Sequence, residues 1–273
     1  MNDTSATHQA VGSPAEGEGP LLRVSEISVF FGGITALSRV SFDIQKGQIF
    51  GLIGPNGAGK TTLFNCLSRI YRTDEGDILF EGRSILGLPD YKMCDIGIGR
   101  TFQNLALFGT MSVIDNIMVG GHHRTSRDYF SNAFRLPWAR REDRRLREEV
   151  MELIDYLDLA DVADIPAGSL PFGTQKRIEL ARALASRPKL LLLDEPAGGL
   201  NHDEVGELVD FIHKMRAEKD LTILLVEHHM NLVMQVSDQV AVLNFGTKIA
   251  DDVPAVIQQH PEVIQAYLGT EQS

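Results

Sequence analysis

The sequence predicts an α/β domain built on a mostly parallel sheet. Short, continuously apolar runs are typical of strands buried on both faces, and they occur as "IFGLIG" (49–54), "KLLLLDE" (189–195) and "LTILLVE" (221–227). Segments with helical periodicity separate these runs, as in βαβ units. The chain of 273 residues is long enough for a substantial core, and no internal repeat is visible. We therefore expect one such domain.

The N-terminal part begins differently. Residues 1–20 are small, polar and rich in glycine and proline, which predicts a disordered tail rather than a secretory signal. From Leu21, "LLRVSEISVF" and "ITALSRVSFDI" flank a turn at Gly32 and Gly33 and alternate as half-buried strands do. "DILFEG" (77–82) is a further strand. These segments predict an N-terminal antiparallel β subdomain.

Two helices are predicted in the middle of the chain. Ser112 and Asp115 stand at capping-box spacing before "VIDNIM", so a helix is expected to start there. Between Arg141 and Leu157 the apolar positions step by four and three, which forms one helical stripe. Its members are Leu146, Val150, Leu153 and Leu157.

Eight arginines lie between residues 122 and 147 of an otherwise acidic chain. A solvated helix face with its connecting loop is the favoured interpretation. Contact with lipid headgroups or with an acidic partner surface is the alternative.

The second half alternates regularly. Helices are predicted for "HDEVGELVDFIHKMRAEK" (202–219) and "HMNLVMQVS" (229–237). "QVAVLNFGTKIADD" (239–252) is a closing hairpin that turns at Asn244 to Gly246. Two short helices split by Pro261 end the chain.

Composition limits the class of protein. The formal net charge of −11 argues against a nucleic-acid partner, because phosphate backbones are bound by excess lysine and arginine. The two cysteines, Cys66 and Cys94, are expected to be reduced thiols of a cytosolic protein. No apolar run approaches the ~18 residues of a membrane helix.

The stretch "GLIGPNGAGKTTLFN" (51–65) carries the chemistry. Gly54, Gly59, Lys60 and Thr61 fit G-x-x-x-x-G-K-[ST], between a predicted strand and a predicted helix. Such glycines let backbone N–H groups approach phosphate oxygens, and the helix N-terminus adds its dipole. Lys60 can contact the β- and γ-phosphates, and the Thr61 hydroxyl can ligate Mg²⁺. The predicted nucleotide-binding residues are Gly54, Pro55, Asn56, Gly57, Ala58, Gly59, Lys60, Thr61 and Thr62.

The strand "LLLLDEP" (190–196) ends in two carboxylates. Asp194 can hold Mg²⁺, and Glu195 can polarise a water that attacks the γ-phosphate. Next to a phosphate-binding loop, this pair is interpreted as catalytic rather than as a surface turn.

Several motifs in order now support a resemblance. "GPNGAGKTT", "TFQN", "LPFGTQKRIELARAL", "LLLLDEP", "GGLN" and "VEHH" resemble the ATP-binding cassette (ABC) ATPases over about residues 21–250. "FGGITAL", "IGRTFQN", "LVEHHMNLVM", "VLNFGTKIA" and "VIQAYLG" resemble the cassette subunits of branched-chain amino-acid importers. The resemblance implies a P-loop NTPase core, with an ATPase domain at 21–255, an α-helical subdomain at about 104–187 and a C-terminal helical extension at 256–273.

The same resemblance implies roles for further residues. Phe31, with Phe30 as rival, would stack on adenine, although either could simply be core. Gln103 would touch Mg²⁺ and the attacking water, and His228 would bond the γ-phosphate. His229 receives no role.

The signature segment departs from the family pattern L-S-G-G-Q. Leu170 is followed by Pro171, Phe172, Gly173 and Thr174, so proline replaces the usual serine. Leu170, Gly173 and Thr174 are still expected to face the nucleotide of an opposite cassette, because a helix N-terminus remains. Likewise Asn201 ends "GGLN", where aspartate is commoner.

Function and partners follow from the resemblance as expectations. The chain would be the ATP-hydrolysing motor of an importer for branched-chain or related hydrophobic amino acids, with ATP and Mg²⁺ as cofactors. Its partners would be permease subunits, a second and unlike cassette and, indirectly, a periplasmic or extracellular substrate-binding protein. It would sit peripherally on the cytoplasmic face of a bacterial or archaeal inner membrane. A urea, amide or aromatic-acid importer, an exporter or lipid transporter, and a soluble non-transport cassette ATPase are the alternatives.

Overall fold

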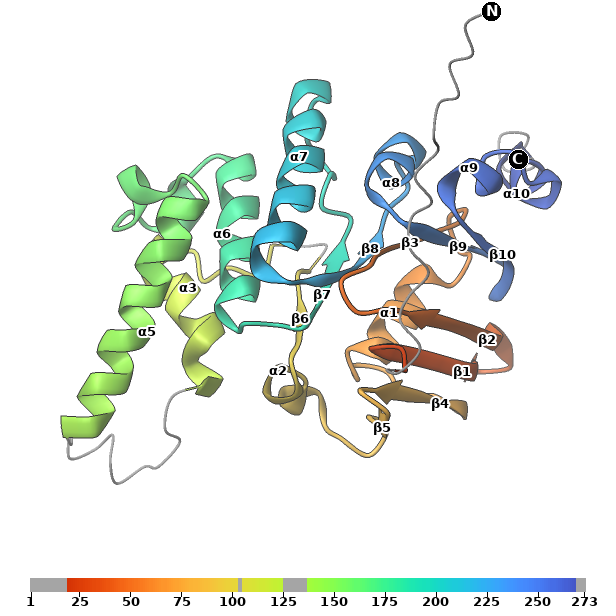
Figure 1. Cartoon of the computed structure of the whole chain (residues 1–273), viewed down its shortest axis with the longest axis horizontal. Helices are drawn as coiled ribbons and strands as arrows, with labels where there is room; N and C mark the ends of the chain where they lie inside the picture. Colours follow the sequence, from red (N-terminus) through yellow and green to blue (C-terminus); the bar gives the residue numbers. More distant parts are fainter. Residues whose placement is uncertain (1–18, 103–104, 125–136, 269–273) are drawn as a thin grey trace, which may run out of the picture.

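The computed structural model describes residues 19–102, 105–124 and 137–268. Two sheets and a group of helices make up the molecule. The antiparallel strands β1, β2 and β4 lie at one end, and the helices α3, α5 and α6 lie at the other (Figure 1). Part of the parallel sheet lies between these two groups.

The N-terminal sheet has the order β2-β1-β4-β5 and is antiparallel throughout, as predicted. Its strands are β1 (Leu22–Phe31), β2 (Ile34–Ile44), β4 (Glu75–Phe80) and β5 (Arg83–Ser84). β4 begins and ends two residues earlier than the predicted 77–82. Glu81 and Gly82 both have positive φ, so the chain turns there and the strand cannot continue.

The second sheet has the order β10-β9-β3-β8-β7-β6. Its strands are β3 (Ile49–Ile53), β6 (Ile98–Arg100), β7 (Leu190–Asp194), β8 (Thr222–Val226), β9 (Gln239–Asn244) and β10 (Thr247–Asp252). All are parallel except the last, which pairs with β9 as a hairpin. Every residue of β3, β7 and β8 is buried, which explains their unbroken apolar sequences. The carboxyl ends of β3, β7 and β8 meet at one edge of the sheet, so the loops that follow them come together.

One strand of this sheet was not predicted. β6 has only three residues and includes a glycine, so it lacks the apolar run that identifies its neighbours. It is a strand because it pairs with β7 from Ile98 to Arg100. Its strand conformation therefore depends on tertiary pairing and not on its own sequence.

Three helices pack beyond β6 and β7. They are α3 (Val113–Gly121), α5 (Pro137–Tyr156) and α6 (Phe172–Ala185). The predicted cap is confirmed, since the Ser112 hydroxyl oxygen accepts a hydrogen bond from the Asp115 N–H at 3.2 Å. The predicted stripe on α5 is also confirmed, with Leu146 and Val150 buried in the core shared with α6.

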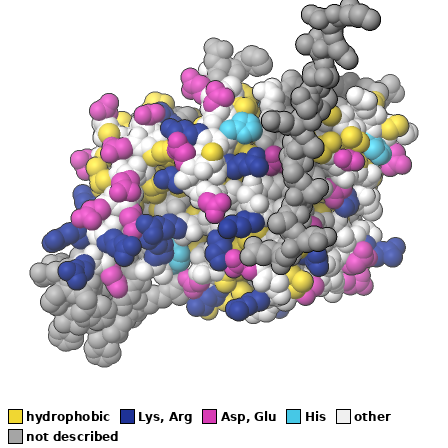
Figure 2. Space-filling view, viewed as in Figure 1, with side chains coloured by type: hydrophobic (Ala, Val, Ile, Leu, Met, Phe, Trp, Pro, Cys, Tyr) yellow, Lys and Arg dark blue, Asp and Glu magenta, His cyan; other side chains and the backbone are white. Residues whose placement is uncertain are grey.

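The arginine-rich stretch is partly ion-paired. Glu149 on α5 lies 2.7 Å from Arg124, 3.3 Å from Arg145 and 2.8 Å from Arg187. Residues 125–136, which contain two of the eight arginines, lie outside the described part of the chain. On the face drawn in Figure 2, basic and acidic side chains are interspersed. This distribution is typical of a solvated surface, which was the favoured interpretation.

The remaining helices cover the parallel sheet and close the chain. They are α1 (Lys60–Leu67), α2 (Met93–Ile96), α7 (His202–Lys219), α8 (Met230–Val236), α9 (Pro254–Ile257) and α10 (Pro261–Leu268). Short 3₁₀ turns occupy Asp90–Lys92, His122–Arg124, Ala160–Val162 and Ala167–Ser169. α7, α8 and the final helix pair agree with the predicted segments. No helix in the described ranges has the length and apolarity to cross a membrane. Both cysteines are free thiols, and burial raises the pKa of Cys66 to about 11.

Candidate nucleotide site

The loop between β3 and α1 is shaped by three glycines with positive φ. These are Gly54 at +154°, Gly57 at +79° and Gly59 at +101°. A Cβ on Gly54 would lie 2.2 Å from the Leu243 carbonyl oxygen, and one on Gly59 would lie 2.8 Å from that of Ala36. Neither position can accept a side chain without moving backbone. At Gly57 a Cβ would meet no other atom, so only its positive φ favours glycine at this position.

The same loop is fastened from outside by a distant turn. The Gly246 N–H, in the β9–β10 turn, donates to the Ala58 carbonyl at 3.0 Å. The Gly246 carbonyl in turn accepts from the Ser38 N–H of β2 at 2.8 Å. One residue of the closing hairpin therefore links the loop to the N-terminal sheet. The sequence predicts the turn but not this link.

Lys60 begins α1 and is folded over its own loop. Its ammonium donates to the carbonyl oxygens of Gly54 at 2.6 Å and Pro55 at 3.0 Å. Burial lowers the pKa of Lys60, and the nearby Glu195 carboxylate opposes this shift. No side chain caps α1, whose first turn carries the exposed Thr61 and the half-buried Thr62. A buried cation beside an uncapped helix N-terminus and a glycine-shaped backbone is a donor set that fits a polyphosphate.

Asp194, at the end of β7, is ion-paired to a residue that the sequence analysis assigned no role. Its Oδ2 lies 3.0 Å from Nη2 of Arg100, which ends β6. Only 5% of the Asp194 side chain and 11% of the Arg100 side chain are exposed. Burial raises the pKa of Asp194 and the Arg100 charge opposes this, while burial lowers the pKa of Arg100.

Arg100 is held from several sides. Nη1 donates to Oδ1 of Asn65 at 2.8 Å and to the Ser68 hydroxyl. The guanidinium lies 4.6 Å from the ring centre of Phe64 and 5.0 Å from that of Phe102, which places it in cation–π contact. A basic residue in the otherwise apolar "IGIGR" was the available signal for this site, but it needed the β6–β7 pairing to be interpretable.

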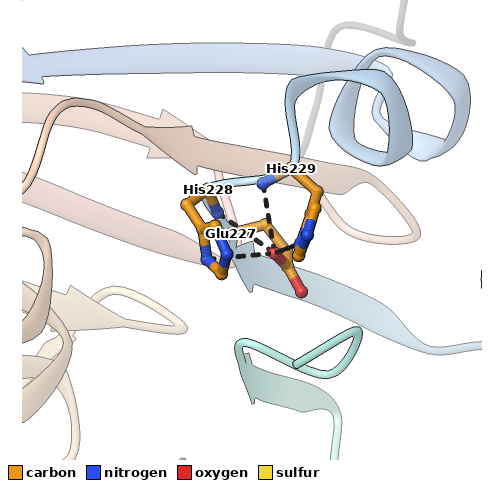
Figure 3. Close-up of side chains that lie close together, drawn as sticks. All are labelled: Glu227, His228 and His229. Carbon is orange, nitrogen blue, oxygen red and sulfur yellow. Dashed lines mark hydrogen bonds and ion pairs between the residues drawn. The ribbon is translucent and has the colours of Figure 1, made fainter. Parts of the chain in front are cut away.

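Glu195 and His228 lie side by side on the loops that follow β7 and β8. His228 Nδ1 is 3.8 Å from Glu195 Oε1, which permits an ion pair when the imidazole is protonated. The Glu195 N–H donates to the Val226 carbonyl at 2.9 Å, and the Glu195 carbonyl accepts from Lys176 of α6. The two predicted catalytic side chains are therefore brought together. Figure 3 shows that Glu227 lies next to His228, with Oε2 at 3.7 Å from His228 Nδ1.

The signature segment forms the start of α6. Leu170 closes a 3₁₀ turn, Pro171 precedes the first helical residue, and Gly173 and Thr174 lie in the first turn. The helix starts at Phe172, directly after Pro171, which occupies the N-cap position with a non-helical backbone (φ −56°, ψ 152°). Pro171, Gly173 and Thr174 also line a cavity of about 500 Å³ between α6 and α7, which Asp194 reaches.

Three other predicted residues have distinct surroundings. Phe31 is 47% exposed and contacts Tyr71 edge-on at 5.5 Å, and Phe30 is 46% exposed, so neither belongs to the core. Asn201 caps α7, because its Oδ1 accepts from the Glu204 N–H at 3.0 Å. Gln103 lies outside the described residues.

Two family profiles match this chain. The profile described as ABC transporter matches residues 37–198, and the profile described as branched-chain amino acid ATP-binding cassette transporter matches residues 247–272. The chain is 42% identical to the high-affinity branched-chain amino acid transport ATP-binding protein BraF of Pseudomonas aeruginosa. It is 40% identical to the protein LivG of Escherichia coli K12. Each match covers 92% of this chain and 98% of the relative.

Solved structures give the same result for the fold. The ADP conformation of an ATP-binding cassette of an ABC transporter superposes with a TM-score of 0.79 at 29% identity, covering 91% of this chain and 98% of that one. CbiO1 of Clostridium perfringens, part of the transporter complex CbiONQ, superposes with a TM-score of 0.75 at 28% identity, covering 91% and 94%.

Proposed function

The chain belongs to the ABC transporter family of ATPases, and from that premise we propose that it drives import of branched-chain amino acids. ATP hydrolysis coupled to transport is the activity of the family. One observation carries the narrower proposal. The chain is similar to BraF and LivG over 98% of their length, and its residues 247–272 separately match the branched-chain amino acid cassette profile.

The residues of the site support specific roles. The Gly54–Thr62 loop and Lys60 would hold the phosphates of ATP, and Phe31 would stack on its base. Glu195 would accept a proton from the attacking water, and His228, 3.8 Å away, would donate to the γ-phosphate. Leu170, Gly173 and Thr174 would face the nucleotide held by an opposite cassette.

Magnesium fits the donors on this edge of the sheet. Thr61 and Asp194 offer a hydroxyl and a carboxylate, the oxygen ligands that Mg²⁺ prefers, and Gln103 would complete the set. When bound, the ion would neutralise charge on the phosphates. Arg100 already pairs with Oδ2 of Asp194 at 3.0 Å, so the ion would bind this carboxylate beside a guanidinium.

The partners follow from the same proposal. Permease subunits, a second and unlike cassette, and a substrate-binding protein outside the cell would complete the importer. The chain would then work peripherally, on the cytoplasmic face of the membrane. Closure of two cassettes on ATP and reopening after hydrolysis would couple the site to the permease, because ATP would prefer the closed state.

A reconstituted complex tests the proposal. Purified chain, partner cassette, permease and binding protein are placed in proteoliposomes with Mg²⁺ and ATP. We expect leucine, isoleucine or valine to stimulate ATPase activity. Stimulation by urea, an amide or an aromatic acid instead would assign a related importer, and stimulation from the cytoplasmic side would indicate an exporter.

The Glu195→Gln variant tests the catalytic assignment. We expect it to bind ATP, accumulate the closed dimer and lose about 10²- to 10⁴-fold in turnover, which is the contribution of a general base. Turnover close to that of the unmodified chain would overturn the role of Glu195.

A further inference from the structure

Glu227 is a fully buried carboxylate directly after β8. Burying a charge is costly unless the group is well hydrogen-bonded. Oε1 accepts from the Ala197 N–H at 2.8 Å. Oε2 accepts from the N–H groups of His228 at 3.1 Å and His229 at 3.3 Å, and faces Nδ1 of His229 at 3.1 Å (Figure 3). A carboxylate only accepts hydrogen bonds, so the His229 contact requires the Nδ1–H tautomer or the imidazolium.

These contacts join two loops of the candidate site. Ala197 lies two residues after Glu195, on the loop that follows β7. His228 and His229 follow Glu227 in the loop after β8. The two strands are already linked by the Glu195 N–H to the Val226 carbonyl, and the Glu227 side chain continues this link beyond the sheet.

We propose that Glu227 is a positioning residue, which fixes Glu195 and His228 relative to each other during ATP hydrolysis. Its two oxygens serve different loops, so the distance between the loops is set by one rigid, planar group. The His228 imidazole consequently lies between two carboxylates, at 3.7 Å from Glu227 and 3.8 Å from Glu195. This inference rests on the proposed ATPase function and adds a residue to it.

The chemistry explains why the residue is glutamate. Both carboxylate oxygens accept hydrogen bonds from N–H groups. A glutamine has only one oxygen, so its NH₂ group would face one of these N–H donors and could not bond it. The inference also gives His229 a role, as a donor to Oε2. Three ligand-type atoms of Glu227, His228 and His229 lie within 4.8 Å of one another. Because N–H donors already satisfy the carboxylate, a hydrogen-bonded cluster describes them better than a metal site does.

A double-variant cycle tests the proposal. Single-turnover ATPase and ATP affinity are measured in the assembled complex for Glu227→Gln, His228→Ala and the pair. We expect Glu227→Gln to lower the rate at least about tenfold, with ATP affinity within about twofold, because the phosphate loop is untouched. In the His228→Ala background the same change should lower the rate less than about twofold, since residues that act as a unit are not additive.

Two outcomes overturn the proposal. Glu227→Gln lowering the rate by the same factor in both backgrounds would show that it does not act through His228. A rate within twofold of the unmodified complex would show that it positions nothing. If Glu227→Gln does not fold, Glu227→Asp is put through the same cycle with the same criteria, because it keeps the charge but is one methylene too short to serve both loops. A complex without ATPase activity before any substitution rejects the proposed function itself.

Discussion

Replacing Arg100 by methionine should strongly destabilise the protein. Methionine keeps an apolar stem next to Phe64 and Phe102 but removes the guanidinium that pairs with Asp194 at 3.0 Å. The Asp194 carboxylate, only 5% exposed, is then left buried without its counterion. Asn65 also loses the donor that Arg100 supplied.

The magnitude follows from the burial of the pair. Removing one partner of a buried ion pair costs about 3–5 kcal/mol in the free energy of unfolding. For a domain of this size each kcal/mol shifts the melting temperature by about 2–4 °C, so Arg100→Met should lower it by about 6–20 °C. The double variant Arg100→Met/Asp194→Asn should recover most of this loss, because no unpaired charge remains.

Thermal unfolding of the purified chain, followed by calorimetry without nucleotide, measures the effect. Arg23→Met is the matched control, since Arg23 makes the same 3.0 Å contact to Asp43 on the surface, where both side chains are well exposed. An exposed pair contributes little, so the control should melt close to the unmodified chain. Arg100→Met melting no lower than Arg23→Met would refute the reasoning.

The pH dependence of the melting temperature supplies a second check on the role of the Arg100–Asp194 pair. Burial raises the folded-state pKa of Asp194, and Arg100 opposes this rise. A carboxyl whose pKa is raised by folding favours the folded state when protonated, and this contribution is lost as pH increases through the raised pKa. Without Arg100 that pKa rises further. The difference in melting temperature between Arg100→Met and the unmodified chain should therefore shrink as the pH is lowered from 7 towards 4, and a difference that grows would contradict this assignment.

Three further predictions concern the glycine-rich loop between β3 and α1 and its surroundings. Lys60→Ala should weaken ATP binding about 10- to 100-fold in titration calorimetry, because it removes charge-assisted hydrogen bonds of about 1.5–3 kcal/mol; unchanged affinity would exclude Lys60 from the site. Gly51→Ala should destabilise the fold by about 1–3 kcal/mol and leave ATP affinity unchanged, since its Cβ would lie 2.5 Å from Val233 Cγ1; urea denaturation with no shift in midpoint would disprove the crowding. Burial raises the pKa of Tyr267 to about 12, and a hydrogen bond with the Gly54 backbone opposes this rise. Tyr267→Phe should therefore cost about 0.5–1.5 kcal/mol in the same assay, and a neutral result would mean that this bond contributes nothing.

Local sequence was sufficient to predict those elements that are marked by their own residues, such as an apolar run or a helix cap. β3, β7 and β8 were recognised because a strand buried on both faces must be apolar throughout. The start of α3 was recognised because its cap is made by Ser112 and Asp115, three residues apart. β6 was missed because three residues are too few to show a strand pattern. The predicted bounds of β4 lay two residues too late, because a glutamate does not by itself indicate the positive φ that Glu81 adopts.

By itself, then, the sequence determined the α/β class, the glycine-rich loop after β3 and the positions of Asp194, Glu195 and His228 at strand ends, because each of these depends on neighbours along the chain. Tertiary structure alone decided what surrounds them. Arg100 reaches Asp194 across 94 positions, Gly246 fastens Ala58, and Glu227 joins the His228 loop to Ala197. These contacts arise from the order of strands in the sheet, which brings carboxyl ends together irrespective of their separation in the chain. No local pattern can encode such partners, since their distance is set by the folded sheet and not by spacing along the chain.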